Sequence, residues 1–420
     1  MIASEVREML SFIDGNPTAY HTTAAVRDIL LKAGFAELLE SRKWALEPGK
    51  DYFVCRNGSS IIAFRMGDQL ENYSFNVAAA HTDSPCFRIK ENAEIHMGQN
   101  YTKLNTEGYG GMICATWMDR PLSVAGRVLV QENGAIVSRL VALDRDLLMI
   151  PSVAIHMNRE VNKGVELNRQ TDMLPVFALL PEEEKKADYF LTFLADELSV
   201  EKTDILDFEL TVYCKENPEF IGLNDDFISS PRLDNLTSCA ALISGLMDAR
   251  RMEGINLIAL FDHEEIGSHT KQGAGSILLH DMLRRILKEL GREQTAEQDL
   301  YRSMLLSVDV AHGIHPNQAG KMDLTNKPVL GRGFCIKEAS SQSYATDCEA
   351  IAIIQQICEK EKIAYQKFVN RSDMPGGSTL GSIASALLPV KTVDIGIPLL
   401  AMHSARELMG SADQQALKDL

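Results

Sequence analysis

Four ionisable residues, Asp262–Glu265, follow directly on an apolar run. The run Ile255–Phe261 contains a single polar residue, and its length and its content of isoleucine and leucine predict a buried strand. Parallel α/β sheets bind their ligands where such strands end. In an extended backbone Glu264 and Glu265 would point to opposite sides, so one carboxylate could bind a metal while the other carries a proton.

Two other interpretations of this cluster have to be weighed. A helical zinc motif of the H-E-x-x-H kind needs histidines four residues apart, whereas His263 and His269 are six apart, or roughly 240° round a helix. That motif is excluded. The second interpretation is an acidic loop that ends a strand and has no chemistry, and this one stays open until the rest of the chain is considered.

Other predicted strands also end in potential metal ligands. Phe75–Ala80 is followed by His81 and Asp83, whose spacing places them on one side of an extended chain. A ligating histidine usually donates its other N–H to a carboxylate or carbonyl, so Asp83 is predicted to orient His81. Met304–Val308 is a further apolar run, and Asp309 follows it.

Two more potential ligands lie close to predicted helices. Asp234 precedes the apolar helix Asn235–Ala249, where it is equally suited to be an N-cap, and His403 precedes the last helix. The complete set is His81, Asp234, Glu265, Asp309 and His403. Two imidazoles and three carboxylates suit a pair of divalent ions, with zinc favoured and cobalt or manganese as alternatives. Glu264 is then the natural general base.

The middle of the chain differs from its two ends. Residues 89–228 contain alternating apolar and polar runs, including a hairpin over residues 122–143 with an Asn-Gly turn. We therefore expect a β-rich domain inserted into an α/β catalytic domain that is formed by residues 1–88 and 229–420. His156 is expected on a strand of the insert, where a packed or surface histidine is the simpler interpretation.

Composition excludes several classes of function. With 45% hydrophobic and 24% charged residues in 420, the chain is an ordinary globular one, and its net charge of −16 opposes binding to nucleic acid and anionic membranes. It shows neither a signal peptide nor an 18-residue apolar run, so we expect a cytoplasmic protein. Eight cysteines without a C-x-x-C pair indicate reduced thiols.

Several blocks of the sequence closely resemble the aspartyl aminopeptidases, a family of metallopeptidases. The blocks are HTDSPCFRIK (81–90), YGGMICATWMDRPLSVAGRV (109–128), SPRLDNL (230–236), FDHEEIGS (261–268), SVDVAH (307–312), YATD (344–347), DMPGGSTLG (373–381) and AMHSARE (401–407). They run in order through nearly the whole chain. The resemblance implies that Asp234 bridges two metals, that His81 and Asp309 complete one of them, and that Glu265 and His403 complete the other.

The resemblance also implies a fold, an assembly and further roles. Glu264 would be the catalytic base and Asp83 the residue that orients the first histidine. The implied fold is a three-layer αβα catalytic domain, like that of zinc exopeptidases, with an inserted β-rich dimerisation domain. Members of the family assemble from dimers into tetrahedral dodecamers, and His156 would reach a neighbouring active site, which replaces the simpler interpretation above.

The family removes N-terminal Asp or Glu from peptides. Lys337, in GFCIKEASSQSYATD, resembles the lysine that meets the acidic side chain, and such a cation would let an acidic protein bind an acidic residue. The other residues expected to bind substrate are His156, His312, Tyr344, Met374 and Gly377. The family's turn M-P-C-G reads M-P-G-G here, with Gly376 in place of the cysteine.

Two alternative functions remain on the basis of sequence. One is a two-metal aminopeptidase of neutral or broad specificity, which relative rates on Asp and Leu substrates would distinguish. The other is a self-assembling scaffold or transported cargo with a vestigial site. Because every expected ligand and the base are present, the sequence argues against the second alternative.

Overall fold

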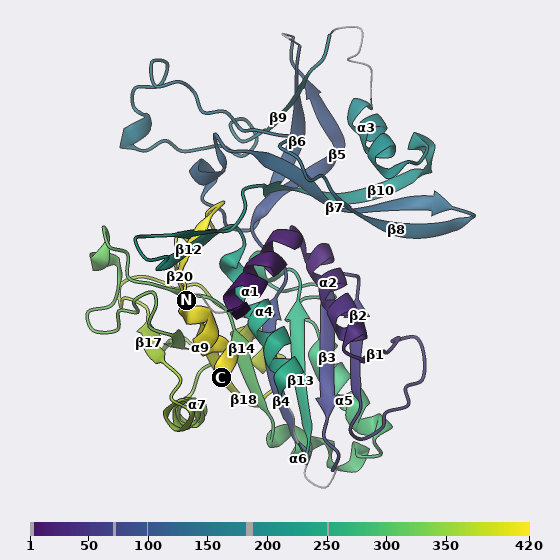
Figure 1. Cartoon of the computed structure of the whole chain (residues 1–420), viewed down its shortest axis with the longest axis vertical. Helices are drawn as coiled ribbons and strands as arrows, with labels where there is room; N and C mark the ends of the chain where they lie inside the picture. The colour runs from purple at the N-terminus through teal and green to yellow at the C-terminus, as the bar shows by residue number, and fades with distance from the viewer. Residues whose placement is uncertain (1–3, 70–72, 99, 182–187, 250–251) are drawn as a thin grey trace. The chain divides into compact units, whose positions relative to one another are not determined.

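The chain folds into two compact units (Figure 1). The structure, a computed structural model, describes residues 4–69, 73–98, 100–181, 188–249 and 252–420. The α/β unit comprises Met1–Ser84, Pro218–Met402 and Glu407–Leu420, and the β-rich unit comprises Pro85–Asn217 and His403–Arg406. Within the described residues no helix is both long enough and apolar enough to cross a membrane.

The α/β unit is built on a sheet to which the described residues contribute nine strands. Their order is β1 (Ala36–Glu37), β2 (Asp51–Arg56), β3 (Ser60–Met66), β13 (Ile255–Phe261), β4 (Phe75–His81), β14 (Met304–Val308), β18 (Lys391–Gly396), β16 (Phe334–Glu338) and β17 (Tyr365–Val369). The central strands β13, β4, β14 and β18 are parallel, whereas β3 and β16 run antiparallel to their neighbours in this group. The carboxyl ends of the four central strands therefore share one edge of the sheet.

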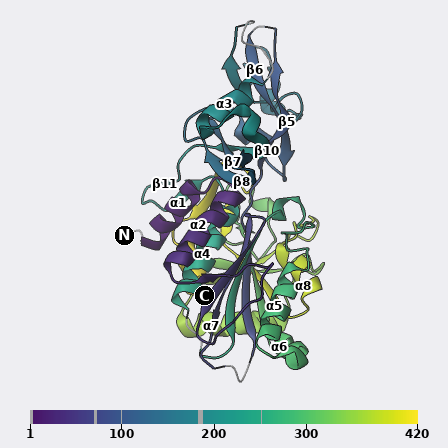
Figure 2. The ribbon, with the colours of Figure 1, turned by 90° about the vertical axis from the view of Figure 1, so that its right-hand side faces the viewer.

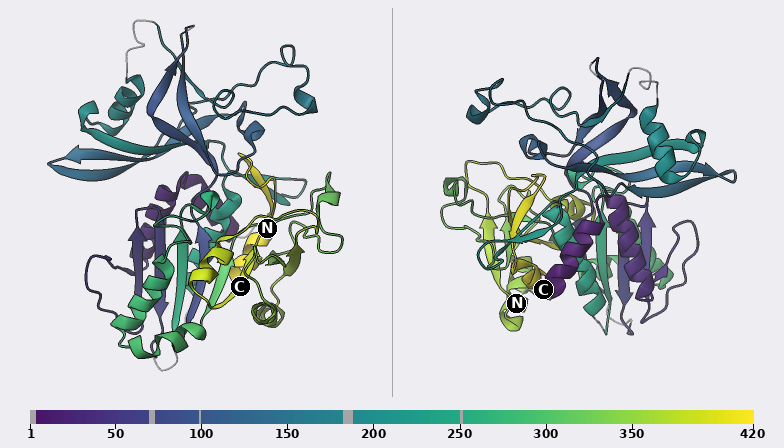
Figure 3. Two further views of the ribbon diagram at one scale, coloured as in Figure 1. Left: turned by 180° about the vertical axis from the view of Figure 1, so that it is seen from behind. Right: turned by 45° about the horizontal axis from the view of Figure 1, so that its top comes forward.

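Helices cover both faces of this sheet (Figures 2 and 3). One face carries α1 (Ser4–Gly15), α2 (Ala19–Lys32), α4 (Leu233–Asp248), α7 (Cys348–Glu361) and α9 (Asp413–Asp419), and the other carries α5 (Leu278–Glu289), α6 (Ala296–Tyr301) and α8 (Leu380–Leu387). A hydrophobic core lies on each face of the sheet, and strand β13 contributes to both. Leu257, Ala259 and Phe261 pack on one side, and Ile258 and Leu260 pack on the other. The prediction of three αβα layers is confirmed.

A smaller sheet in the α/β unit joins segments that are distant in sequence. Among the described residues it has five strands, β11 (Glu219–Ile221), β12 (Phe227–Ser230), β20 (Glu407–Gly410), β19 (Pro398–Leu400) and β15 (Ala311–His312). This unit also has the short 3₁₀ helices η4 (Glu264–Ile266), η5 (Glu293–Thr295) and η6 (Ala319–Lys321). Strand β12 leads directly into α4, so this sheet helps to fix where α4 begins.

The β-rich unit is an antiparallel sheet packed against a helix. In the part of the chain that is described, its six strands lie in the order β8 (Ala135–Ala142), β7 (Leu122–Glu132), β10 (Ile205–Cys214), β5 (Cys86–His96), β6 (Tyr101–Tyr109) and β9 (Val176–Leu179). It also contains α3 (Tyr189–Leu198), η1 (Cys114–Trp117), η2 (Val161–Lys163) and η3 (Lys202–Asp204). The predicted hairpin is confirmed as β7 and β8, with positive φ at Asn133 (49°) and Gly134 (80°) as a tight Asn-Gly turn requires.

One local expectation for this unit is wrong. His156 lies on no strand but in an exposed turn. Its neighbours Val153, Ile155 and Met157 are also exposed, with 56%, 47% and 82% of their surface accessible. The apolar spacing of this segment therefore reflects large exposed side chains and not one buried face of a strand.

Candidate metal centre

Parallel pairing brings His81 beside the acidic cluster. His81 is the last residue of β4, and its register partner on β13 is Phe261, the residue immediately before Asp262. Strand β14 pairs with β4 on its other side, and Asp309 follows directly after β14. The carboxyl ends of three neighbouring strands thus deliver one imidazole and several carboxylates to the same edge of the sheet.

Glu264 and Glu265 do not continue the strand in an extended conformation, as the sequence analysis expected. His263 has a left-handed backbone (φ 64°), and the two glutamates begin the 3₁₀ helix η4. The side chain of Asp83 holds this turn, since its Oδ1 accepts the N–H of Glu264 and its Oδ2 accepts the N–H of Glu265, both at 3.2 Å. A carboxylate that accepts two successive N–H groups fixes the direction of both side chains.

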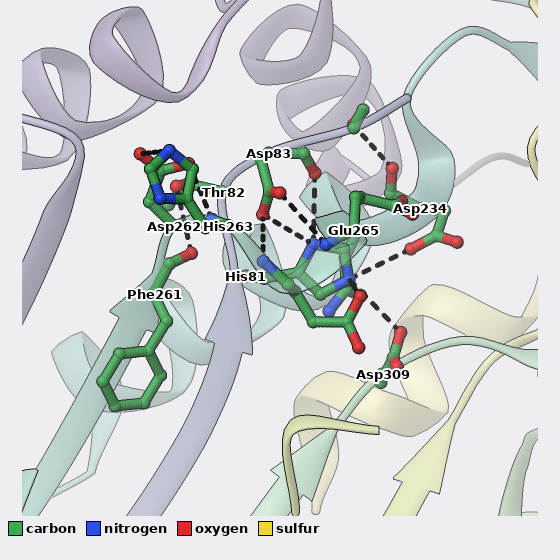
Figure 4. Close-up of polar contacts among 12 residues, drawn as sticks. His81, Thr82, Asp83, Asp234, Phe261, Asp262, His263, Glu265 and Asp309 are labelled. Carbon is green, nitrogen blue, oxygen red and sulfur yellow. Dashed lines mark hydrogen bonds and ion pairs between the residues drawn. The ribbon is translucent and has the colours of Figure 1, made fainter. Parts of the chain in front are cut away.

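The two ring nitrogens of His81 face different partners (Figure 4). Its Nδ1 lies 3.1 Å from the carbonyl oxygen of Asp83 and 3.4 Å from that residue's Oδ1. Its Nε2 lies 3.2 Å from Oδ1 of Asp234 and 3.5 Å from Oδ1 of Asp309. A proton on Nδ1 leaves Nε2 as an acceptor among carboxylates, which is the arrangement of a metal-binding histidine with an orienting partner.

Asp234 is held by contacts from several parts of the chain. Its N–H donates to Oε2 of Glu407 at 2.9 Å, and its carbonyl oxygen accepts the hydroxyl of Ser84 at 2.8 Å. The next residue, Asn235, donates its side-chain amide to the carbonyl oxygen of Val308 at 3.0 Å. The backbone angles of Asp234 (φ −79°, ψ 106°) are not helical, and its carboxylate faces His81. An N-cap residue also has non-helical backbone angles, so these angles agree with either interpretation, and the contact of the carboxylate with His81 favours a ligand.

These groups form a site with the chemistry of a metal centre. One potential ligand atom each from His81, Asp234 and Glu265 lie within 4.8 Å of one another. Imidazole nitrogen and carboxylate oxygen are ligands that zinc accepts, and a divalent cation would offset the repulsion among the carboxylates. The residues present therefore fit a divalent metal.

Burial and crowding make the carboxylates difficult to ionise without such a cation. Burial, together with the negative charges of Asp309, Asp83 and Asp234, raises the pKa of Glu264 to about 8. Burial and the charge of Asp234 also raise the pKa of Glu265 well above its ordinary range. A divalent cation would favour the ionised form of these carboxylates, so the raised pKa values describe the site without a metal.

The fifth expected ligand, His403, belongs to the β-rich unit. Its Nδ1 lies 2.7 Å from the carbonyl oxygen of Gly111, so a proton on Nδ1 would leave Nε2 available. This is the same division of roles that the ring of His81 shows. The assignment of His403 as a metal ligand stays a prediction.

Apart from His156, which belongs to the β-rich unit, the residues expected to bind substrate fall into two groups within the α/β unit. Lys337, on β16, is 1% exposed; its Nζ donates to the carbonyl oxygen of Val310 at 3.0 Å and lies 5.0 Å from the ring centre of Tyr344. His312, Met374 and Gly377 instead line an open cavity of about 390 Å³. The first group is buried close to Asp309, and the second faces solvent.

The space beside Gly376, which replaces the family's usual cysteine, is occupied by another side chain. A Cβ atom built on Gly376 would lie 2.1 Å from Nδ2 of Asn370, so the amide of Asn370 fills the space that the side chain of a cysteine would need. A cysteine at this position would therefore require the side chain of Asn370 to move.

Two residues to which the sequence assigned no role contribute to the site. Glu407 is 3% exposed and holds the backbone of Asp234, although it was noted only as part of the block AMHSARE. Asp262 is buried beside the cluster; burial and the charge of Asp83 raise its pKa to about 6, and its Oδ1 accepts the N–H of His263 at 2.8 Å. Asp262 directly follows an apolar run, which was the available signal for its burial, whereas Glu407 follows Arg406 and offered no comparable signal.

Comparison with known proteins identifies the family. The family described as Aminopeptidase I zinc metalloprotease (M18) matches residues 12–419. The chain belongs to the M18 family. A probable M18 family aminopeptidase 2 of Clostridium novyi (strain NT) is 45% identical over 410 residues, which cover 97% of this chain and 95% of the relative. The chain is thus a metallo-aminopeptidase, and the resemblance to this group of metallopeptidases is confirmed.

Solved structures of M18 relatives share the fold. A chain in the cryo-EM structure of the Ape4 and Nbr1 complex has a TM-score of 0.95 at 35% identity, covering 99% of this chain and 84% of that chain. The structure of the S. cerevisiae mApe1 dodecamer has a TM-score of 0.84 at 25% identity, covering 99% of this chain and 95% of that chain. These similarities support the architecture that places the candidate metal ligands at the edge of the sheet.

Proposed function

We propose that this M18 aminopeptidase removes acidic residues, Asp or Glu, from the N-termini of peptides. The observation that carries the proposal is the place of Lys337. Its Nζ donates to the carbonyl oxygen of Val310, the residue next to Asp309. Burial disfavours the ammonium ion, but the charges of Asp309 and Asp394 outweigh this effect and raise the pKa of Lys337 above its ordinary value. A cation that keeps its charge beside the metal-binding cluster suits a substrate carboxylate.

The reaction would use the residues of the cluster in distinct roles. Asp234 would bridge two divalent ions, with His81 and Asp309 on one and Glu265 and His403 on the other. When bound, such ions polarise the scissile carbonyl and lower the pKa of water.

The proton transfers would fall to a residue that is not a ligand. Glu264 would accept a proton from the attacking water and donate it to the leaving amine. Its Oε2 lies 4.0 Å from Nε2 of His81, and this short distance to a proposed ligand supports the role. Asp83 would keep both His81 and Glu264 in position, through the contacts described above.

A second candidate is a two-metal aminopeptidase of neutral or broad specificity. The observation in its favour is also at Lys337, which is 1% exposed and already donates to Val310. A substrate carboxylate would have to compete with this carbonyl, or the surrounding residues would have to open. If they do not, the first residue of the peptide is selected by shape and not by charge.

The assembly and the place of action are also part of the proposal. The similar mApe1 structure is a dodecamer, so we expect this chain to assemble from dimers into a closed dodecamer. Residues 89–228 would be the dimerisation domain, with His156 reaching a neighbouring active site. All eight cysteines, each within the described residues, are free, which agrees with action in the reducing cytoplasm. Light scattering that showed a monomer at working concentration would contradict the assembly.

The test of specificity is the initial rate on peptides that differ only in the first residue. Purified protein is stripped of metal, restored with zinc, cobalt or manganese, and assayed on substrates that begin with Asp, Glu, Leu or Lys. Metal-dependent turnover confined to Asp and Glu supports the proposal, whereas equal or faster turnover of Leu supports the second candidate. Absence of turnover with every metal would contradict both.

A variant of Lys337 assigns the specificity to this residue. In Lys337→Met the ratio of kcat/KM for Asp over Leu substrates should fall about tenfold or more, because a charge-assisted hydrogen bond is lost. The matched control is Lys391→Met, whose side chain is 46% exposed and pairs with Glu349. An unchanged ratio in a folded Lys337→Met would remove Lys337 from substrate recognition.

A further inference from the structure

A buried carboxylate that the proposed reaction does not use, that of Asp394, lies beside Lys337. In the pairing of β16 with β18 these two residues are direct register partners, so their side chains lie on the same face of the sheet. Asp394 is fully buried, and Lys337 is 1% exposed. Neither an aspartate nor a lysine is readily buried in this way without a partner.

Hydrogen bonds from two other segments fix the carboxylate of Asp394. Its Oδ1 accepts the hydroxyl of Thr379, and its Oδ2 accepts the N–H of Ala345, both at 2.6 Å. The backbone N–H of Asp394 donates to the hydroxyl of Thr346 at 2.9 Å. Because each carboxyl oxygen has a donor, the group cannot turn away without losing one of these bonds. The contacts therefore hold the carboxylate at a fixed place in the core.

The charges of Lys337 and Asp394 act on one another. Burial is the largest influence on both groups, because it lowers the pKa of Lys337 and raises the pKa of Asp394. The charge of Asp394 raises the pKa of Lys337, and the charge of Lys337 lowers the pKa of Asp394, although burial prevails there and the pKa of Asp394 is raised overall. Each group thus favours the charged form of the other.

Other carboxylates that favour the charged form of Lys337 belong to the metal-binding cluster. They are those of Asp309 and Asp234. In the proposed function both bind divalent ions, whose positive charge offsets that of the carboxylates. Asp394 has no such role, and its register partner on β14, Ser307, lies two residues before Asp309. With metals bound, Asp394 is therefore the carboxylate that still acts on Lys337.

We infer that Asp394 is the counter-ion of Lys337 and, through it, a positioning residue for the selection of the first residue. The inference rests on the proposed function, in which Lys337 meets the acidic side chain of the substrate. Asp394 itself would not touch the substrate. It would keep Lys337 charged after metal ions occupy the cluster, so that the acidic side chain meets an ammonium ion and not a neutral amine.

The variant Asp394→Asn removes the charge and keeps the shape. Its amide oxygen can accept the N–H of Ala345, and its amide N–H can donate to the hydroxyl of Thr379, which turns to accept it. In the zinc-loaded enzyme, the ratio of kcat/KM for Asp over Leu substrates should fall about tenfold, through a higher KM for Asp substrates. The rate on Leu substrates should change by less than about threefold. In a Lys337→Met background, Asp394→Asn should lower the ratio no further.

Melting temperatures in the presence of zinc test the pair without an activity assay. Lys337→Met should lower the Tm because Asp394 loses its cation, and Asp394→Asn should lower it because the buried ammonium loses its counter-ion. Adding Lys337→Met to Asp394→Asn should cause no further fall, since neither charge is then present. If Asp394→Asn does not fold, the double variant should fold.

Asp299→Asn is the matched control. Asp299 is also fully buried, and its carboxylate pairs with a different cation, Arg292, at 2.8 Å. This change should lower the Tm by an amount that adds to the effect of Lys337→Met. It should leave the Asp over Leu ratio unchanged.

The outcomes separate this inference from the proposed function. An unchanged Asp over Leu ratio in a folded Asp394→Asn, in an enzyme that prefers Asp, would overturn the inference. A double variant whose fall in Tm equals the sum of the two single falls would also overturn it, as would a double variant that fails to fold when Lys337→Met folds. If the wild type prefers Leu, the acidic specificity fails, and the Tm of the double variant alone decides whether Asp394 is the counter-ion.

Discussion

The carboxylate of Asp83 accepts the backbone N–H of Glu264 at 3.2 Å, and through this bond a residue after β4 sets the direction of the side chain proposed as the base. The same carboxylate accepts the N–H of Glu265 and lies 3.4 Å from Nδ1 of His81. One residue thus holds a proposed ligand on each of two neighbouring strands. Asp83 is therefore best understood as the residue that keeps the site assembled before a metal binds.

This relationship predicts a measurable effect of Asp83→Asn. An asparagine offers one acceptor oxygen where the carboxylate offers two, so one of the two N–H groups loses its partner and His81 loses its orienting charge. We expect zinc affinity and kcat each to fall by about 10–100-fold. Zinc titration with an indicator and steady-state kinetics measure the two effects. Asp281→Asn, at a side chain that is 60% exposed on α5, is the control, and equal behaviour of the two variants would contradict the positioning role.

Variants of the adjacent residues Glu264 and Glu265 should distinguish the catalytic base from the metal ligand. Glu264→Gln should reduce kcat by about 10²–10⁴-fold, because the proton acceptor is lost, while the protein still binds zinc. Glu265→Gln should lower zinc binding itself, since the changed group is a proposed ligand. Metal content after dialysis, measured beside activity, distinguishes them. Full activity of Glu264→Gln would refute the mechanism, and unchanged metal content in Glu265→Gln would remove that residue from the ligands.

Removal of the metal should make stability depend on pH with a definite sign. Glu264 keeps its proton in the folded protein up to its raised pKa of about 8, whereas its ordinary value is 4.5. Between these values the folded state binds more protons than the unfolded state, so the free energy of unfolding falls as pH rises through this window. His81 acts in the same direction, since its neighbouring carboxylates outweigh burial and raise its pKa well above 6.5.

Thermal melting with a chelator, from about pH 5.5 to about pH 8.5, measures this dependence. The Tm of the metal-free protein should fall as pH rises, and the fall should be smaller in Glu264→Gln. Added zinc should stabilise more at high pH, where its ligands are deprotonated. A metal-free protein whose Tm rises steadily over this range would contradict the assignment of raised pKa values.

A cysteine in place of Gly376, as in the family's usual M-P-C-G turn, should lower the stability of this chain slightly. Gly376→Cys would force the amide of Asn370 to move, and we expect a loss of about 1 kcal/mol in the free energy of unfolding. The second change Asn370→Ser should restore most of this loss. Gly377→Cys is the matched control, because a Cβ at that position would meet nothing within 4 Å. Equal losses at the two positions, measured by denaturant unfolding, would show that the amide of Asn370 is not the cause.

The sequence was sufficient to predict the central strands and to name the proposed ligands that follow them. The apolar run before Asp262 coincides with β13, and the run before His81 coincides with most of β4. A central strand is covered on both faces, so it needs a nearly continuous apolar run that can be recognised in the sequence. The identities of the groups that follow these strands are equally local. For this reason the metal-binding chemistry could be predicted before any contact was known.

The tertiary structure alone decided how these residues meet. The pairing of β4 with β13 and β14 joins segments that are distant in the chain, and no local pattern specifies such a register. The turn at Glu264 is helical and not extended because it is bound by Asp83, a residue from another strand end. The burial of Lys337 and the exposure of Lys321 likewise follow from which elements pack together. The residue type alone does not determine whether a lysine lies in the core or on the surface.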